Sequence, residues 1–191
     1  MLSLTRAANA GCALCRWHVT GEKHEGVYSR QALPIVWDYS EGNPMSAATG
    51  GYEGALDWVA RVVEAWPSST SGQVQLADAA EHPLPDQTAP IWFTDPPYYD
   101  AIPYADLSDF FLVWLKRALS GHPLLRDPFD PANPLTPKRR EAVQDETKRD
   151  NGRAKDRAWF EETMARAFAE GRRVLREDGI GSVVFAHKTT E

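Results

Sequence analysis

The chain has 191 residues, enough for about one domain with a substantial core. Its 42% hydrophobic and 25% charged residues are ordinary for a soluble globular protein, and no apolar run reaches the ~20 residues that a membrane-spanning helix needs. The formal net charge of −6 argues against a chain that binds nucleic acid over a wide surface by itself, because phosphate contacts need clustered lysines and arginines.

Residues 1–29 show no sustained hydrophobic period, so we expect an irregular N-terminal segment. Arg6 interrupts the short apolar run at the start, which argues against an export signal, and two cysteines then predict a cytoplasmic location. Cys12 and Cys15 form a C-x-x-C pair that histidines follow, and thiolate with imidazole suits zinc. Structural zinc sites usually have a longer loop between ligand pairs, so we expect no metal site and keep zinc as the alternative.

The next part of the chain predicts a short ordered element, a helix and a strand. Residues 30–50 mix apolar positions with turn-forming residues. Apolar residues at helical spacing then predict a helix over 52–66, and the Pro- and Ser-containing stretch 67–72 ends it. The brief run 74–77 predicts a strand with Asp78 at its end.

A second apolar run, at 91–94, predicts a buried strand, and Asp95, Pro96, Pro97 and Tyr98 follow it directly. In open α/β sheets, ligands bind at the carboxyl ends of the strands. The two prolines lack N–H groups and have a fixed φ, so they end the strand pairing and stiffen the turn. A carboxylate and an aromatic ring held close together suit a planar base with an amino group.

The rest of the chain predicts two helices and a strand around a long loop. A one-sided apolar pattern predicts a helix over 104–119, and a proline-rich then charged stretch predicts a loop over 120–155. A helix is predicted over 156–176 with Gly179 as its stop, followed by a strand over 180–186. This order predicts an α/β fold with a partial Rossmann-like sheet and flanking helices.

The stretch Asp95-Pro96-Pro97-Tyr98 after a hydrophobic strand resembles the catalytic motif of S-adenosylmethionine-dependent amino-methyltransferases. Residues 30–44, 95–109 and 179–191 are similar to a family of large bacterial adenine-specific DNA methylases that carry a zinc ribbon and an N-terminal domain of unknown function. The resemblance implies a partial methyltransferase domain over 30–191. It also implies methyl transfer from S-adenosylmethionine to N6 of an adenine that is flipped out of DNA.

The resemblance implies a role for each residue of the motif and for Asp78. Asp95, helped by the Pro96 carbonyl, would accept a hydrogen bond from the N6 amino group close to the methyl donor, with Pro97 stiffening the turn. Tyr98 would stack on the base. Asp78 would contact the adenine ring of the cofactor, although an Asp in a turn is also common for local hydrogen bonding.

Further residues are weaker candidates for the substrate side. Tyr99 would continue the pocket wall, with a purely structural role as the alternative. His187 and Lys188 follow the last predicted strand and would contact substrate phosphate, with surface solvation as the alternative. The basic residues of the long loop suit a DNA backbone, but acidic residues lie among them, and a solvated loop is the default interpretation.

A cofactor-binding half should also have a strand that leads into a glycine-rich turn and a helix, and no such pattern occurs here. The resemblance places that loop before Met1 and further strands after Glu191, so the sheet is expected to be incomplete at both ends. DNA and a complementary methyltransferase fragment are then the expected partners, with no membrane. The alternatives are an inactive fragment or subunit that binds DNA or such a chain, and a methyltransferase acting on an RNA base or a protein amide nitrogen.

Overall fold

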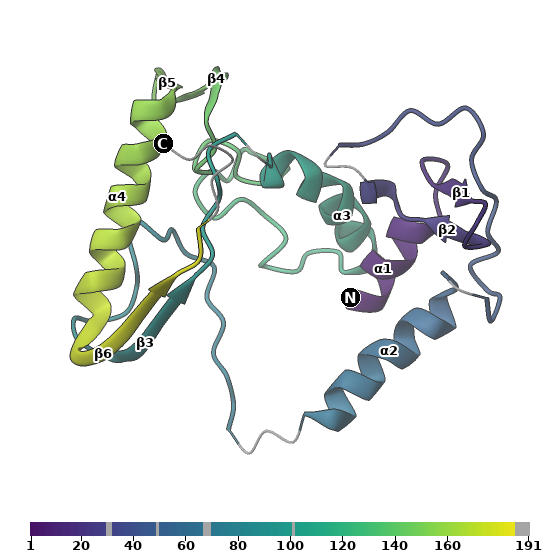
Figure 1. The fold of residues 1–191 in the computed structure, drawn as a ribbon, viewed down its shortest axis with the longest axis horizontal. Helices are drawn as coiled ribbons and strands as arrows, with labels where there is room; N and C mark the ends of the chain where they lie inside the picture. Colours follow the sequence, from purple (N-terminus) through teal and green to yellow (C-terminus); the bar gives the residue numbers. More distant parts are fainter. Residues whose placement is uncertain (30–31, 49, 67–69, 101, 186–191) are drawn as a thin grey trace. The chain divides into compact units, whose positions relative to one another are not determined.

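The computed structural model describes residues 1–29, 32–48, 50–66, 70–100 and 102–185 (Figure 1). The chain forms two compact units, each made of several segments. The first unit comprises Met1–Val74, Asp106–Arg126 and Pro134–Thr136, and the second comprises Gln75–Ala105, Asp127–Asn133 and Pro137–Glu191. Among the described residues, none of the helices is both long and apolar enough to cross a membrane.

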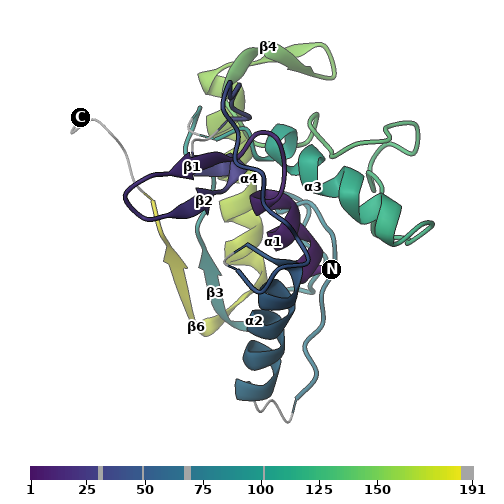
Figure 2. The ribbon, with the colours of Figure 1, turned by 90° about the vertical axis from the view of Figure 1, so that its right-hand side faces the viewer.

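The first unit combines helices with a small hairpin. Its elements are α1 (Leu2–Ala10), β1 (Arg16–His18), β2 (Lys23–Glu25), the 3-10 helix η1 (Val27–Ser29), α2 (Tyr52–Ala65) and α3 (Tyr104–Ala118) from Asp106 onward. Strands β1 and β2 pair antiparallel (Figure 2). Helix α1 contacts both α2 and η1. Helices α2 and α3 confirm the helices predicted over 52–66 and 104–119.

The prediction of an irregular segment over residues 1–29 was wrong. Cys15 and Val27 in this segment are completely buried. The hydroxyl of Tyr28 donates a 2.7 Å hydrogen bond to the carbonyl of Leu107, and its ring lies 5.4 Å from that of Phe111. Three-residue strands are too short to show a hydrophobic period, so this hairpin leaves no clear signal in the sequence.

The second unit contains the parallel strand pair on which the candidate site lies. Strand β3 (Ala89–Thr94) pairs in parallel with β6 (Leu175–Val183), with Thr94 opposite Val183. Helix α4 (Arg157–Val174) packs on one face of the pair, where the Trp92 ring meets Phe168 edge-on at 6.1 Å. The α/β fold class and the predicted strand over 91–94 are therefore confirmed, while the parallel sheet has two strands within the described residues.

Helix α4 supplies most of the hydrophobic core of the second unit. Its N-cap, Asp156, accepts a 2.8 Å hydrogen bond from the N–H of Trp159. The core residues are Trp159, Phe160 and Met164, with Tyr99, Ala142 and Phe168 packed against them.

The helix predicted over 156–176 is confirmed as α4, but the role of Gly179 as its stop was wrong. The helix ends at Val174, and β6 begins at the next residue without a loop. Gly179 lies inside β6, where a Cβ atom would come within 3.0 Å of the Pro90 carbonyl oxygen. Close approach between the two strands, and not a helix C-cap, therefore explains the glycine.

The prediction of a structureless loop over 120–155 is partly wrong, because this segment contains an ordered hairpin. Strand β4 (Asp145–Asp150) pairs antiparallel with β5 (Arg153–Lys155). Asn151 and Gly152 connect the strands with φ values of 48° and 86°. An Asn-Gly pair with positive φ at both residues is the preferred two-residue hairpin turn. Charged strand residues of low β-propensity concealed this signal in the sequence.

The strand predicted over 74–77 was also wrong. These residues pair with no strand in the described part of the chain, and the Val74 side chain is 96% exposed. Four residues without a neighbouring strand cannot form ladder hydrogen bonds. Asp78 therefore follows a segment without regular secondary structure and begins a turn.

Candidate functional site

The Asp-Pro-Pro-Tyr turn leaves the carboxyl end of β3. Oδ1 of Asp95 accepts a 2.5 Å hydrogen bond from the hydroxyl of Tyr98, three residues further on. Asp95 is exposed, whereas Pro96 is buried and Pro97 half-buried. Because both intervening residues have a fixed φ, the turn keeps the carboxylate and the phenol facing each other. The structure thus brings the predicted acid and the predicted ring together at the edge of the sheet.

Tyr98 is held from a second strand as well. Its ring packs edge-on against Phe185, with centroids 5.2 Å apart and an interplanar angle of 79°. Phe185 lies just after β6, so the site uses the carboxyl ends of both parallel strands. The hydrogen bond to Asp95 raises the pKa of Tyr98 above its ordinary value, which keeps the phenol a hydrogen-bond donor. Sequence analysis missed Phe185, although its position at the end of a predicted strand was the available signal.

Tyr99 makes contacts that tie it to the core of the second unit. Its ring lies 4.7 Å from that of Phe160, and the Arg157 guanidinium lies 5.6 Å from its centroid. Its hydroxyl donates to Glu161 at 3.2 Å, and its carbonyl accepts from the N–H of Gln144 at 3.0 Å. These contacts support the structural alternative, and its role in the pocket wall stays a prediction.

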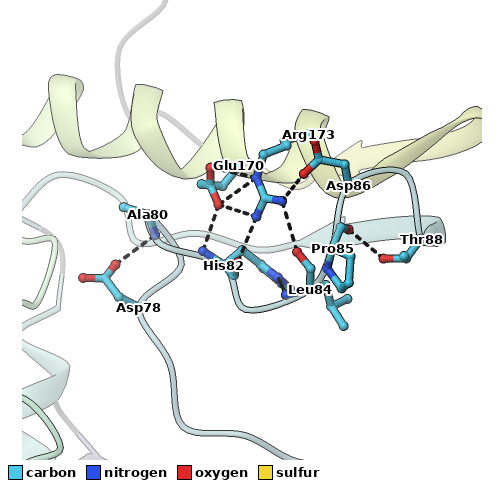
Figure 3. A network of polar contacts seen from close by, with 9 residues as sticks. All are labelled: Asp78, Ala80, His82, Leu84, Pro85, Asp86, Thr88, Glu170 and Arg173. Carbon is cyan, nitrogen blue, oxygen red and sulfur yellow. Dashed lines mark hydrogen bonds and ion pairs between the residues drawn. The ribbon is translucent and has the colours of Figure 1, made fainter.

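Both carboxylate oxygens of Asp78 have partners. Oδ1 accepts a 2.8 Å hydrogen bond from the N–H of Ala80 (Figure 3), and Oδ2 accepts one of 3.0 Å from Arg140. Among the described residues, no hydrogen bond or ion pair connects Asp78 with the Asp-Pro-Pro-Tyr turn. The predicted contact of Asp78 with the cofactor therefore competes with an existing turn and ion pair.

A clamp of polar contacts, formed by Arg173 and Glu170, fastens the loop before β3 to helix α4 (Figure 3). Arg173 donates to the carbonyls of His82 at 2.8 Å and Leu84 at 3.1 Å, and it pairs with Asp86 at 2.5 Å. Glu170 accepts from the N–H of His82 at 3.0 Å. Hydrogen bonding to Arg173 lowers the pKa of Glu170, so the clamp is charged at neutral pH.

The basic residues around the β4–β5 hairpin are largely used within the fold. Lys155 is completely buried, and its Nζ donates to the carbonyls of Lys138 at 2.7 Å and Glu141 at 2.6 Å. Burial lowers the pKa of Lys155. Arg153 forms an ion pair with Glu162 at 2.6 Å. These partners weaken the hypothesis that this stretch follows a DNA backbone.

Two other predictions concern residues away from the turn. His187 and Lys188 lie outside the described residues, so their contact with substrate phosphate stays a prediction. The Sγ atoms of Cys12 and Cys15 lie 3.8 Å apart. Within the described part of the chain, no three or more His, Cys, Asp and Glu side chains come together to hold a metal ion.

Comparison with known proteins assigns no family to the chain. No protein-family model matches it, and no match was found among curated proteins or solved structures. A functional interpretation therefore depends on the chemistry of the turn and on the resemblance of its motif.

Proposed function

We propose that this chain forms the base-binding part of a methyltransferase that uses S-adenosylmethionine to methylate N6 of adenine in DNA. The observation that carries the proposal is the pairing of Asp95 with Tyr98 at the carboxyl ends of two parallel strands. Ligands of α/β proteins bind at this edge. The turn combines there an exposed acceptor for an amino group with an aromatic face.

Asp95 is suited to hold an amino group. The N6 nitrogen of adenine is a weak nucleophile because its lone pair is delocalised into the ring. Tyr98 occupies Oδ1 of the carboxylate, and no other hydrogen bond to Asp95 comes from the described residues. Oδ2 is thus an acceptor for the amino N–H, and the rigid turn fixes its direction. This is electrostatic positioning of the nucleophile, which is effective when the group is preorganised.

Tyr98 is suited to the base itself. Two contacts define the orientation of its side chain: the hydroxyl bonds to Asp95, and the ring makes a T-shaped contact with Phe185. Base–aromatic stacking tolerates any base and offsets part of the cost of extruding one from the duplex. The hydrogen bond that Asp95 would accept from an amino group then distinguishes adenine from thymine, which has no amino group.

The fit to the cofactor is incomplete. S-adenosylmethionine would supply the methyl group, but both oxygens of Asp78 have partners, and no described strand leads into a glycine-rich turn that opens a helix. The described residues thus offer contacts for the target base, and a glycine-rich cofactor turn is not among them. The proposal therefore needs a glycine-rich loop from outside the described residues, and a complementary methyltransferase fragment could supply it.

The test measures transfer of labelled methyl groups from S-adenosylmethionine to adenine-containing DNA. It compares the chain alone with a mixture of the chain and a methyltransferase fragment that carries the glycine-rich loop. We expect transfer in the mixture and a loss of about 100-fold or more in Asp95→Asn, which keeps the shape but removes the charge. Asp178→Asn, an exposed position on β6, is the matched control. Unchanged transfer in Asp95→Asn would refute the site. Absence of transfer in both conditions, with DNA still bound, would favour the inactive subunit.

A further inference from the structure

Cys12 and Cys15 form a close pair of thiols in the first unit. The N–H of Cys15 donates to the carbonyl of Cys12 at 3.0 Å, which closes a turn, and the two Sγ atoms lie 3.8 Å apart. A turn of this kind keeps its first and fourth Cα atoms within about 7 Å, near the range that a disulfide bridges. Bond formation at about 2.05 Å then needs side-chain rotation and only a small backbone shift.

The two thiols differ in access. Cys12 is half-buried, whereas Cys15 is completely buried. Burial raises the pKa of Cys15, so its thiol stays protonated more readily than an exposed one. A small reagent in solution therefore meets Cys12 first, and Cys15 reacts through its neighbour. An accessible thiol beside a second, protected thiol is the arrangement of an attacking and a resolving cysteine.

We propose that Cys12 and Cys15 form a dithiol modification site that exchanges with small-molecule disulfides. The Cys12 thiolate attacks one sulfur of the reagent, which forms a mixed disulfide and releases one thiolate. Cys15 then gives its proton to the released thiolate and attacks the Cys12 sulfur, which closes the Cys12–Cys15 bond and releases the second thiolate. The protein dithiol is oxidised by two electrons, and the reagent disulfide is reduced to two thiols.

Closure of this bond would reach two neighbouring segments. The Cys15 thiol donates to the carbonyl of Asn9, near the end of α1, at 3.3 Å, and oxidation removes this donor. The Cys15 carbonyl accepts from the N–H of Ser40 at 3.0 Å, and the Ser40 hydroxyl lies 2.6 Å from Nδ1 of His24. The modification therefore removes a hydrogen bond at the end of α1. It also constrains the turn whose carbonyl binds Ser40.

Metal binding is the competing use of two adjacent thiols. A structural zinc site needs four ligands, and the described residues bring no third His, Cys, Asp or Glu side chain to the pair. Exchange chemistry needs only the two sulfur atoms.

The experiment equilibrates the full chain in mixtures of reduced and oxidised glutathione. Free thiols are counted with a chromogenic reagent, and the intact mass is measured. We expect both thiols to disappear together, a monomer lighter by two hydrogen atoms, and full reversal by reduced glutathione. Cys15→Ser should instead retain one glutathione on Cys12, whereas Cys12→Ser should react slowly because its remaining thiol is buried.

Several results would overturn the proposal. The wild-type chain could keep a stable glutathione adduct or form disulfide-linked dimers. Its thiols could also stay reduced in oxidised glutathione alone, or hold stoichiometric zinc in the purified chain. If Cys15→Ser does not fold, wild type and Cys12→Ser still distinguish these cases, because only wild type can lose two thiols without gaining mass.

Discussion

The hydroxyl of Tyr98 donates a hydrogen bond of 2.5 Å to Oδ1 of Asp95, across two consecutive prolines. This bond directs the phenol toward the carboxylate while the ring makes a T-shaped contact with Phe185. The acid and the ring can therefore be separated by substitution, because removal of the hydroxyl leaves the aromatic face in place.

Tyr98→Phe and Tyr98→Ala test which part of the side chain binds the base. We expect Phe to keep most of the affinity for an adenine placed opposite an abasic site, because the stacking face remains. Ala should weaken binding by about tenfold or more. Fluorescence anisotropy of a labelled duplex measures both, with Tyr52→Ala on α2 as the control. Equal losses in Phe and Ala would show that the ring does not stack on the base.

Gly171→Ala tests the packing of α4 on the parallel strand pair. A Cβ at Gly171 would lie 2.3 Å from the Trp92 ring, so we expect a loss of about 1–3 kcal/mol from overpacking, despite the better helix propensity of Ala. Gly54→Ala on α2 is the matched control, because its Cβ would meet no atom within 4 Å. This change should stabilise by about 0.4–1 kcal/mol. Urea denaturation measures both, and a stabilised Gly171→Ala would contradict the packing.

Gly152→Ala tests the turn of the β4–β5 hairpin. Gly152 has a φ of 86°, which costs an L-residue with a Cβ about 1–2 kcal/mol. We expect hydrogen exchange to accelerate in β4 and β5. Asn151→Gly keeps the positive φ without strain and should leave exchange within a few fold of wild type. An unchanged exchange pattern in Gly152→Ala would mean that this hairpin does not form in solution.

Glu170→Gln tests the clamp through the pH dependence of stability. Arg173 lowers the pKa of Glu170 below its ordinary value of 4.5, so the folded chain binds fewer protons there than the unfolded chain. The stabilisation by the charged Glu170 is therefore complete above about pH 4.5, and it is lost as the pH falls through the lowered pKa. Urea midpoints should fall less steeply with acid in Glu170→Gln than in wild type. Glu64→Gln on α2 is the control. If the urea midpoint of Glu170→Gln falls with acid as steeply as those of wild type and the control, the clamp does not contribute to acid unfolding.

Local sequence patterns determined much of the fold and one part of the candidate site. Apolar residues at helical spacing predicted α2, α3 and α4, and an apolar run predicted β3. The two prolines placed Asp95 and Tyr98 on one turn, because a fixed φ is a property of the residue itself. These features depend on residues within a few positions of each other, so they can be predicted without knowledge of the rest of the chain.

Only the tertiary structure decided which distant residues meet. Phe185 reaches Tyr98 because β6 pairs with β3. Arg140 donates a hydrogen bond to Oδ2 of Asp78, which lies 62 residues away in the sequence. The contact of Tyr28 with Leu107 and the missing strand at 74–77 depended on distant residues as well. A strand of a few residues gains its hydrogen bonds and burial from its neighbours, so its own sequence cannot determine whether it forms. For the same reason the turn at Asp95 was predictable, whereas the support behind Tyr98 and the partners of Asp78 were not.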